Sequence, residues 1–314
     1  MPRIITSKER ECGCVKKIGI LTFHKSINYG SVMQAFALSD LLIKRGYDVD
    51  IIDYEPASYS TQYRIFEKKT TLHNIAANIR RLLVFDILWK QKKGFEKFRE
   101  KYLPISICKY TKSSSPQEFS KYYNVVICGS DQIWNVTAKD CDPIFFLPGK
   151  QSYKKIAYAT SVNTATYNED ICNDQLRKNI LDFDYISIRE HSGAEKISCF
   201  LNTDKQVKVQ PDPSLLQTKE VFAAIASKRI VENTYIFMYC ANYQESTIRA
   251  AQKVSKLLNK PVYTVIVSRS ATQIEKLKKS GINIIRDKNR PEDFLSFITV
   301  SYTHLRAHET GRNL

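Results

Sequence analysis

A polar loop near the start of the chain has the residue types of an anion site. The loop spans 24–31 (HKSINYGS) and lies between an apolar run and a helical pattern. Gly30 permits close approach of a ligand to the backbone, and Ser31 can cap a helix whose first N–H groups attract phosphate or carboxylate. A plain turn followed by a helix cap fits the same residues, so both interpretations stay open.

A second polar cluster follows the apolar run 124–128 (NVVIC). It consists of Ser130, Asp131, Gln132, Trp134 and Asn135. Amides and a carboxylate can bond sugar hydroxyls, and an aromatic face can cover a sugar ring, so a saccharide site is one interpretation. A capped turn with a packed tryptophan is the other.

A third cluster centres on Arg189, which follows the apolar run DYISI, and a fourth, Asp212-Pro213-Ser214, follows VKVQ. An arginine at the end of a strand can hold a carboxylate or phosphate through two parallel hydrogen bonds. A purely structural pair of Arg189 with Glu190 or Asp212 fits the sequence equally well.

Cofactor and metal signatures are weak. The sequence contains neither G-x-G-x-x-G nor G-x-x-x-x-G-K-[ST], so a dinucleotide or P-loop site has little support. Cys12 and Cys14 are one residue apart, which does not fit the usual spacing of zinc ligands, and no matching pair lies downstream. We expect reduced thiols and no metal site.

The apolar pattern predicts the elements that position these clusters. An apolar run from 17 to 23, a helical pattern ending at Gly46 and a second run from 47 to 54 form a βαβ unit. Further strand and helix patterns alternate along the chain. They predict an N-terminal extension (1–15) and two doubly wound, Rossmann-like α/β domains, 16–217 and 218–299.

A basic helical insert, 64–101, interrupts the first domain. It carries eleven Lys/Arg and four Asp/Glu. One interpretation is a solvated helical hairpin, in which Phe95 and Phe98 pack inward. The alternative is a basic surface that recruits anionic lipid headgroups or a lipid-linked substrate.

The net charge of +16 favours anionic partners. Nucleic acid is not expected, because no RNP, helix-turn-helix or zinc pattern accompanies the charge. The first ten residues are polar, and nowhere do about 18 consecutive apolar residues occur, as a membrane-spanning helix needs. We therefore expect a cytoplasmic protein, with peripheral contact at the inner face of an anionic membrane as an alternative.

The segment 300–310 (VSYTHLRAHET) reads back through the genetic code as a transposase adapter used to build sequencing libraries. We interpret 300–314 as adapter-derived and expect the natural sequence to be interrupted near Thr299. On this interpretation His304 and His308 have no functional meaning. The second domain is then incomplete, and residues beyond about 300 are expected to be exposed or frayed.

The segments KIGILTFHKSINYGSVMQAFAL, YDVDIIDY, VVICGSDQIWN, IAYATSVN, DYISIREHSGAEKI, VQPDPSLL and PEDFLSFI occur in this order. As an ordered set they resemble the polysaccharide pyruvyl transferase family over about residues 16–299. The resemblance implies two Rossmann-like domains in a GT-B-like arrangement. It also implies a transferase that moves the enolpyruvyl unit of phosphoenolpyruvate onto sugar hydroxyls, forming a pyruvate ketal of a cell-surface polysaccharide or its precursor. No organic cofactor is expected.

The resemblance also suggests roles for individual residues. Arg189 matches an arginine position that we assign to phosphoenolpyruvate, and Gly30 and Ser31 join it at the donor. The residues assigned to the saccharide acceptor, free or lipid-linked, are Asn28, Tyr29, Ser130, Asp131, Gln132, Trp134 and Asn135. Family members continue past PEDFLSFI into a DSFHG-like segment, whose histidine is the expected general acid. Here other residues stand in that place, so we expect this chain to be inactive.

Two other functions fit the same features. A GT-B glycosyltransferase that uses a nucleotide sugar shares the architecture and also places an anion at a helix start. A non-catalytic protein that binds glycans or lipids would suit the basic insert. An assay distinguishes the three functions. The pyruvyl transferase would release phosphate from phosphoenolpyruvate, the glycosyltransferase would release nucleotide from a sugar nucleotide, and the binding protein would bind without turnover.

Overall fold

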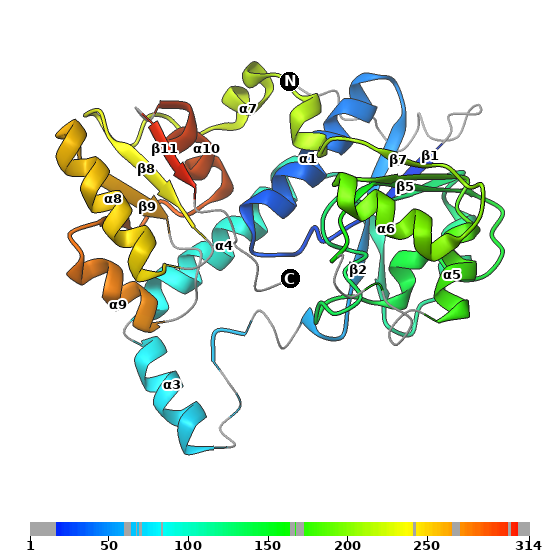
Figure 1. Ribbon diagram of the computed structural model, residues 1–314, viewed down its shortest axis with the longest axis horizontal. Coiled ribbons are helices and arrows are strands. Elements are labelled where there is room, and N and C mark those ends of the chain that lie inside the picture. Colours follow the sequence, from blue (N-terminus) through cyan, green and yellow to red (C-terminus); the bar gives the residue numbers. More distant parts are fainter. Residues whose placement is uncertain are drawn as a thin grey trace.

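The computed structural model describes residues 17–59, 64–66, 68, 71–82, 84–163, 167, 173–240, 243–265, 271–300 and 303–306. These residues form two lobes, each built on a parallel sheet that carries helices (Figure 1). The predicted class, two Rossmann-like α/β domains in a GT-B-like arrangement, is therefore confirmed. Cys12 and Cys14 lie outside the described residues, as does the predicted extension 1–15.

The larger sheet has seven parallel strands in the order β3-β2-β1-β4-β5-β6-β7. Its strands are β1 (Lys17–Leu21), β2 (Asp48–Glu55), β3 (Ile105–Thr111), β4 (Val125–Cys128), β5 (Lys154–Thr160), β6 (Tyr185–Ile188) and β7 (Val207–Val209). Strands β2 and β3 extend the sheet on one side of β1, and the later strands extend it on the other. Between β1 and β4 the order reverses, and ligands of open α/β sheets bind beyond the carboxyl ends of the strands at such a switch point.

In chain order the described α-helices are α1 (Tyr29–Lys44), α3 (Leu72–Leu82), α4 (Phe85–Tyr102), α5 (Asp174–Leu181), α6 (His191–Leu201), α7 (Lys219–Ile225), α8 (Glu245–Leu258), α9 (Ala271–Lys279) and α10 (Pro291–Val300).

Helices cover both faces of the larger sheet. Helices α5 and α6 pack on one face through Ile180 and Ile197. Helices α1 and α4 pack on the other through Phe36, Phe95 and Phe98. Among the described helices, none combines the length and apolar character needed to cross a bilayer.

The smaller sheet has four parallel strands in the order β10-β9-β8-β11. They are β8 (Ile236–Tyr239), β9 (Val262–Val265), β10 (Asn283–Ile285) and β11 (Thr303–Arg306). Strand β11 pairs with β8 in register from Thr303 opposite Ile236 to Arg306 opposite Tyr239. The expectation that residues beyond about 300 are frayed is therefore wrong for 303–306, because backbone pairing does not require apolar side chains.

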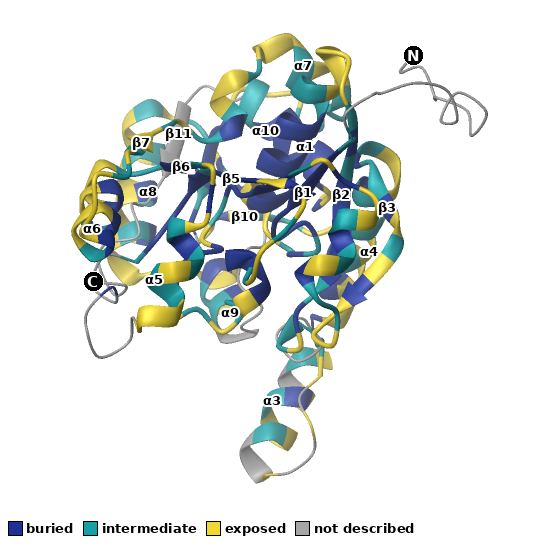
Figure 2. Cartoon of the chain, turned by 90° about the vertical axis from the view of Figure 1, so that its right-hand side faces the viewer, coloured by how far each residue is buried: buried dark blue, intermediate teal, exposed yellow. Residues whose placement is uncertain are grey.

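The two lobes share a core. The apolar cluster that includes Phe36, Phe95 and Phe98 of the first lobe continues into Phe237 and Phe297 of the second. Both α1 and α4 approach α10 (Figure 1). Figure 2 shows α1 and α10 as mostly buried, whereas α4 alternates buried residues with exposed ones. The predicted packing role of Phe95 and Phe98 is confirmed, and α4 belongs to the contact between the lobes rather than to a separate solvated hairpin.

Candidate functional site

The loop after β1 ends in a capped helix. The side-chain oxygen of Asn28 accepts hydrogen bonds from the backbone N–H groups of Gly30 at 2.8 Å and Ser31 at 3.4 Å. The Asn28 side chain therefore provides acceptors for two of the N–H groups at the start of α1. A bound anion would accept hydrogen bonds from the same N–H groups. Donor binding by Gly30 and Ser31 stays a prediction, and it requires the Asn28 side chain to move.

The loop after β4 is packed tightly against β5. Gly129 has a φ of +120°, and a Cβ at this position would lie 2.2 Å from the carbonyl oxygen of Tyr158. The peptide bond from Gly129 to Ser130 is cis. The hydroxyl of Ser130 is buried and donates to the carbonyl of Ala159 at 2.7 Å. Ser130 is therefore a buried part of the loop, and its hydroxyl also lies 3.5 Å from Oδ2 of Asp212.

A buried amide joins the two loops at the switch point. The Nε2 group of Gln34 donates to Oγ1 of Thr22 at 2.8 Å, and the backbone N–H of Ser130 donates to Oε1 of Gln34 at 3.1 Å. Thr22 in turn donates to the carbonyl of Ser130 at 3.0 Å. Neither Gln34 nor Thr22 was predicted as a site residue. The available signal was a single amide within the otherwise apolar helical stretch SVMQAFAL, since a buried polar side chain needs partners.

Asp131 receives bonds from its own loop and from α1. The hydroxyl of Ser31 donates to Oδ2 of Asp131, and the backbone N–H of Gln132 donates to Oδ1 at 2.8 Å. The carbonyl of Asp131 accepts from the backbone N–H of Ser161 at 2.8 Å. Ser31 and Asp131 thus meet beyond the carboxyl ends of β1 and β4, as predicted for the edge of such a sheet.

Arg189 lies between two carboxylates beyond the end of β6. Its Nε–H group donates to Oε1 of Glu190 at 2.9 Å, and Nη1 donates to Oδ2 of Asp212 at 3.0 Å. Burial lowers the pKa of the Arg189 guanidinium, but Glu190 and Asp212 outweigh burial and raise the pKa, so the side chain stays charged. The structural pairing that the sequence left open is therefore present.

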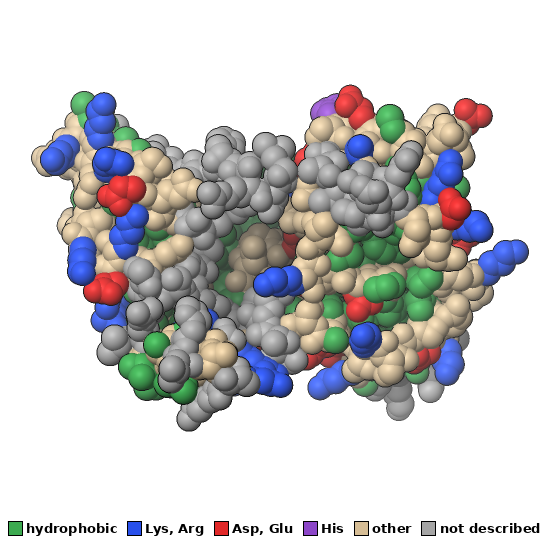
Figure 3. Space-filling model, turned by 60° about the horizontal axis from the view of Figure 1, so that its bottom comes forward, with side chains coloured by type: hydrophobic (Ala, Val, Ile, Leu, Met, Phe, Trp, Pro, Cys, Tyr) green, Lys and Arg blue, Asp and Glu red, His purple; other side chains and the backbone are tan. Residues whose placement is uncertain are grey.

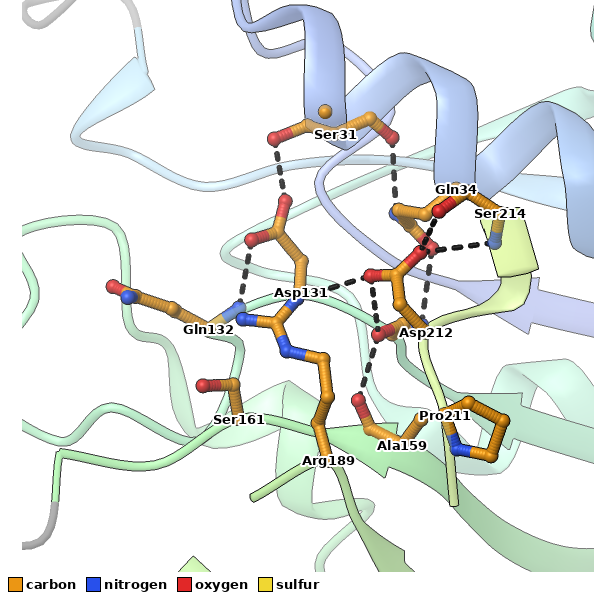
Figure 4. A network of polar contacts seen from close by, with 12 residues as sticks. Ser31, Gln34, Asp131, Gln132, Ala159, Ser161, Arg189, Pro211, Asp212 and Ser214 are labelled. Carbon is orange, nitrogen blue, oxygen red and sulfur yellow. Dashed lines mark hydrogen bonds and ion pairs between the residues drawn. The ribbon is translucent and has the colours of Figure 1, made fainter. Parts of the chain in front are cut away.

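Both carboxylates that hold Arg189 are themselves fixed. Asp212 caps the 3-10 helix η5 (Pro213–Leu216), accepting from the backbone N–H of Ser214 at 2.9 Å and from its hydroxyl at 2.7 Å. Glu190 accepts from the hydroxyl of Ser161 at 2.9 Å. Figure 4 shows the side chains of Ser31, Asp131, Arg189 and Asp212 directed toward one another.

This arrangement can orient a guanidinium toward a ligand. The Arg189 side chain is 29% exposed, so a ligand can reach it. Its bonds to described residues use Nε and Nη1, and a guanidinium offers further N–H groups in the same plane. An anion bound at these further N–H groups would be attracted by Arg189 and repelled by the carboxylates of Glu190 and Asp212. Its affinity would therefore depend on the geometry of its hydrogen bonds more than on the net charge of the site.

A profile of the polysaccharide pyruvyl transferase family matches residues 28–299. The chain belongs to this family. A comparison with curated proteins gives no significant match.

Solved structures similar to this pyruvyl transferase family member are distant in sequence. The UDP-GlcNAc 2-epimerase of Methanocaldococcus jannaschii shares 12% identity over 93% of this chain and 79% of its own, with a TM-score of 0.45. A putative UDP-N-acetylglucosamine 2-epimerase of Listeria monocytogenes shares 10% identity over 95% of this chain and 75% of its own, with a TM-score of 0.47.

Trp134 is a core residue of this family member. Its side chain is fully buried, its Nε1–H donates to the carbonyl of Phe145 at 3.0 Å, and its ring stacks on Phe146. An indole with no exposed face cannot cover a sugar ring. The assignment of Trp134 to the acceptor is therefore corrected in favour of the packed tryptophan.

Tyr29 is also a packing residue. Its ring is buried and stacks on Phe294 with centroids 4.5 Å apart, and its hydroxyl donates to the carbonyl of Asn289 at 3.0 Å.

Asn135 is buried as well, and its Oδ1 accepts from the hydroxyl of Thr137 at 2.9 Å. The structure therefore corrects the acceptor assignments of Tyr29 and Asn135. Ser130 lacks an exposed face too, whereas Gln132 is exposed and Asp131 is partly exposed.

A second polar group joins the loop after β1 to strand β2. The buried ring of His24 lies 3.2 Å from Oδ1 of Asp53 through Nε2, and Lys25 Nζ lies 2.7 Å from the same oxygen. Burial lowers the pKa of His24, which favours the neutral ring. Burial raises the pKa of Asp53, but its hydrogen bonds and the charge of Lys25 outweigh this and lower the pKa to about 2.

A cavity of about 660 Å³ adjoins this group at the ends of β2 and β3. Its lining includes Lys25, Glu55, Lys109, Tyr110 and Lys112. This cavity was not predicted from the sequence, because Lys109 lies on β3, a strand that the apolar pattern missed, and Lys112 directly follows that strand. Across the described part of the chain, no three His, Cys, Asp or Glu side chains form a group that could hold a metal ion.

Proposed function

We propose that this protein transfers the pyruvyl group of phosphoenolpyruvate to hydroxyls of a saccharide, forming a pyruvate ketal and releasing phosphate. The match of residues 28–299 to the pyruvyl transferase family carries the proposal. The site geometry supports it, because a charged and reachable arginine lies beyond the carboxyl edge of a Rossmann-type sheet.

The donor in this proposal binds at Arg189. Phosphoenolpyruvate carries a carboxylate and a phosphate, and either group fits the planar edge of a guanidinium. Glu190 and Asp212 hold the guanidinium in one orientation, so little entropy is lost when the donor binds. Gly30 and Ser31 join the donor site once the Asn28 cap opens.

The chemistry requires a proton and two hydroxyls. Protonation of the methylene carbon of phosphoenolpyruvate makes the neighbouring carbon electrophilic, and one sugar hydroxyl adds there while losing its proton. A second hydroxyl of the same saccharide then replaces the phosphate at that carbon, and its proton leaves with the phosphate, which gives a cyclic ketal and inorganic phosphate. This route uses no organic cofactor. His24 is not the proton source, because it is buried and its pKa is lowered.

The acceptor binds along the same sheet edge. Asp131 and Gln132 retain exposed surface and can bond sugar hydroxyls, with Asn28 beside them. The cavity beside Lys25 supplies Lys109 and Lys112, whose charges suit a saccharide that carries phosphate. We propose a precursor of a cell-surface polysaccharide, modified at the cytoplasmic face of the membrane.

The test uses a chain in which the DSFHG-like segment of the family replaces 300–314, which we call the restored chain, because the 314-residue chain is expected to be inactive and serves as the control. The restored chain is given phosphoenolpyruvate and a panel of bacterial glycan precursors, both free and lipid-linked, and all kinetic measurements use it. Phosphate release and the mass of the product are measured together. A product heavier by one ketal-linked pyruvyl group, formed only with phosphoenolpyruvate, is expected. Phosphate release without a pyruvylated product, or glycosyl transfer from a sugar nucleotide instead, would refute the proposal.

A further inference from the structure

Helix α3 is amphipathic in the opposite sense to an ordinary surface helix. Ile75, Ile79 and Leu82 lie four and three residues apart, so they share one face. All three are exposed to solvent, with 60% of Ile79 and 62% of Leu82 accessible. A helix of a globular protein normally turns its apolar stripe toward the core. In α3 this stripe points outward.

The polar face of α3 is the one that packs against the protein. Asn78 is buried. The side chain of Asn74 donates to the carbonyl of Lys68 at 3.0 Å, and Nη1 of Arg81 donates to the carbonyl of Ile65 at 3.2 Å. These bonds fix the rotation of the helix about its axis. Exposure of the apolar face therefore follows from the packing of the polar face.

The exposed apolar surface continues onto the start of α4. Phe85 is exposed and stacks on Phe66 with ring centroids 5.6 Å apart, and 47% of Trp89 is accessible. We name the whole surface the apolar ridge; it consists of Phe66, Ile75, Ile79, Leu82, Phe85 and Trp89. Large apolar side chains that are exposed together on two successive helices indicate an interaction site.

The apolar ridge stands away from the two sheets. Figures 1 and 2 show α3 projecting from the rest of the molecule. Figure 3 brings the lower side of Figure 1 forward, which is the side from which α3 projects, and shows the surface hollowed between the two lobes. A flat partner against this side of the molecule would face both the projecting α3 and the hollow.

Charge identifies the partner. The segment 64–101 carries eleven Lys/Arg and four Asp/Glu. Two of the acids lie in ion pairs, Asp86 with Arg286 and Glu96 with Lys93. A second copy of the chain would bring a second cationic segment against the first, and the two would repel. Anionic lipid headgroups would instead attract the cationic segment, while the apolar and aromatic side chains of the ridge enter the boundary between headgroups and acyl chains.

We propose that the apolar ridge inserts into the surface of an anionic bilayer and docks the protein with its hollow toward the membrane. This deepens the proposed function, since it would bring a lipid-linked saccharide to the site. Trp89 provides a direct reporter. The chain has two tryptophans, and Trp134 is fully buried, so a change in emission on docking comes from Trp89.

The experiment adds vesicles of phosphatidylcholine, with or without phosphatidylglycerol, to the full chain. Cosedimentation and tryptophan emission are measured at low and high salt. We expect binding and a blue shift with the anionic vesicles, both weakened by salt. The double variant Ile79→Glu/Leu82→Glu should bind at least tenfold more weakly. The matched control is Leu257→Glu on α8, which replaces an 81% exposed leucine outside the ridge and should bind as the unchanged protein does.

Three outcomes would overturn the docking proposal. These are no binding to anionic vesicles, equal binding by the ridge variant, or a concentration-dependent dimer that the ridge variant abolishes, which would make the ridge a contact between copies. Transfer to a soluble acceptor, measured in the restored chain, separates the two proposals. Vesicle binding without any pyruvyl transfer would refute the proposed function and leave the docking surface standing.

Discussion

The guanidinium of Arg189 and the carboxylate of Asp212 are joined across the end of the sheet, with Nη1 and Oδ2 3.0 Å apart. Asp212 also caps η5 through Ser214. The arginine is therefore oriented by a group that is itself held by backbone, and not by a mobile side chain. Such support is what a binding site needs if a planar anion is to meet the guanidinium at a fixed angle.

Replacing Arg189 with lysine should raise the KM for phosphoenolpyruvate. Arg189→Lys keeps the positive charge and loses the planar fork, which should cost about 1 to 3 kcal/mol of donor binding, or roughly 5- to 150-fold in affinity. Steady-state kinetics with varied phosphoenolpyruvate measure this. Arg177→Lys is the control, because Arg177 donates to the carbonyl of Leu201 away from the site. An unchanged KM in the Arg189 variant would show that the arginine is structural.

Gly129→Ala should destabilise the fold strongly. The new Cβ would lie 2.2 Å from the carbonyl oxygen of Tyr158, at a φ of +120°. Strain and overpacking together should cost about 3 kcal/mol or more. Gly46→Ala is the matched control, since Gly46 also has a positive φ, +87°, but a Cβ there meets nothing within 4 Å. Its cost should be about 1 to 2 kcal/mol. Equal denaturation midpoints for the two variants would contradict the clash.

The apolar pattern was sufficient to predict the central strands of both sheets. Strands β1, β4, β8 and β9 are buried, and their sequences are short apolar runs. Strand β3 was missed, because it lies at the edge and Ser106 separates Ile105 from Ile107, so that its sequence contains no continuous apolar run like those of the central strands. The pairing of β11 was not expected either, since it depends on backbone groups rather than on apolar side chains.

The site was predictable in position but not in detail. Clusters that follow strands meet at one edge in a parallel sheet, so Ser31, Asp131 and Arg189 were correctly placed near the ends of β1, β4 and β6. Sequence order does not tell whether an aromatic ring turns toward a ligand or toward the core. Trp134 and Tyr29 turn toward the core, because Phe146 and Phe294 supply stacking partners there.

Trp134→Phe should lower stability and leave acceptor binding unchanged. The substitution removes the Nε1–H donor and leaves the buried carbonyl of Phe145 without this bond, which should cost about 1 to 3 kcal/mol. The KM for the saccharide should not change. Trp89→Phe, on the exposed start of α4, should alter stability by less than about 0.5 kcal/mol. A raised acceptor KM with unaltered stability in the Trp134 variant would restore a binding role.

The buried pair of His24 and Asp53 should make stability depend on pH. Burial lowers the pKa of His24 in the folded state below its ordinary value of 6.5. Below pH 6.5 the unfolded chain therefore binds the proton more readily than the folded chain does. The free energy of unfolding contributed by His24 is therefore complete above about pH 6.5 and decreases as the pH falls, by up to about 1.4 kcal/mol per pH unit. Asp53, with a pKa of about 2, stays ionised through this range.

Chemical denaturation between pH 7 and pH 5 measures this dependence. The glutamine of His24→Gln keeps a donor for Asp53 but does not titrate, so the pH slope of its unfolding free energy should be smaller than that of the unchanged protein. The comparison of slopes cancels every other titrating group. A His24 variant with the original slope would mean that His24 is protonated in the folded protein, stabilised by Asp53 more than burial opposes it.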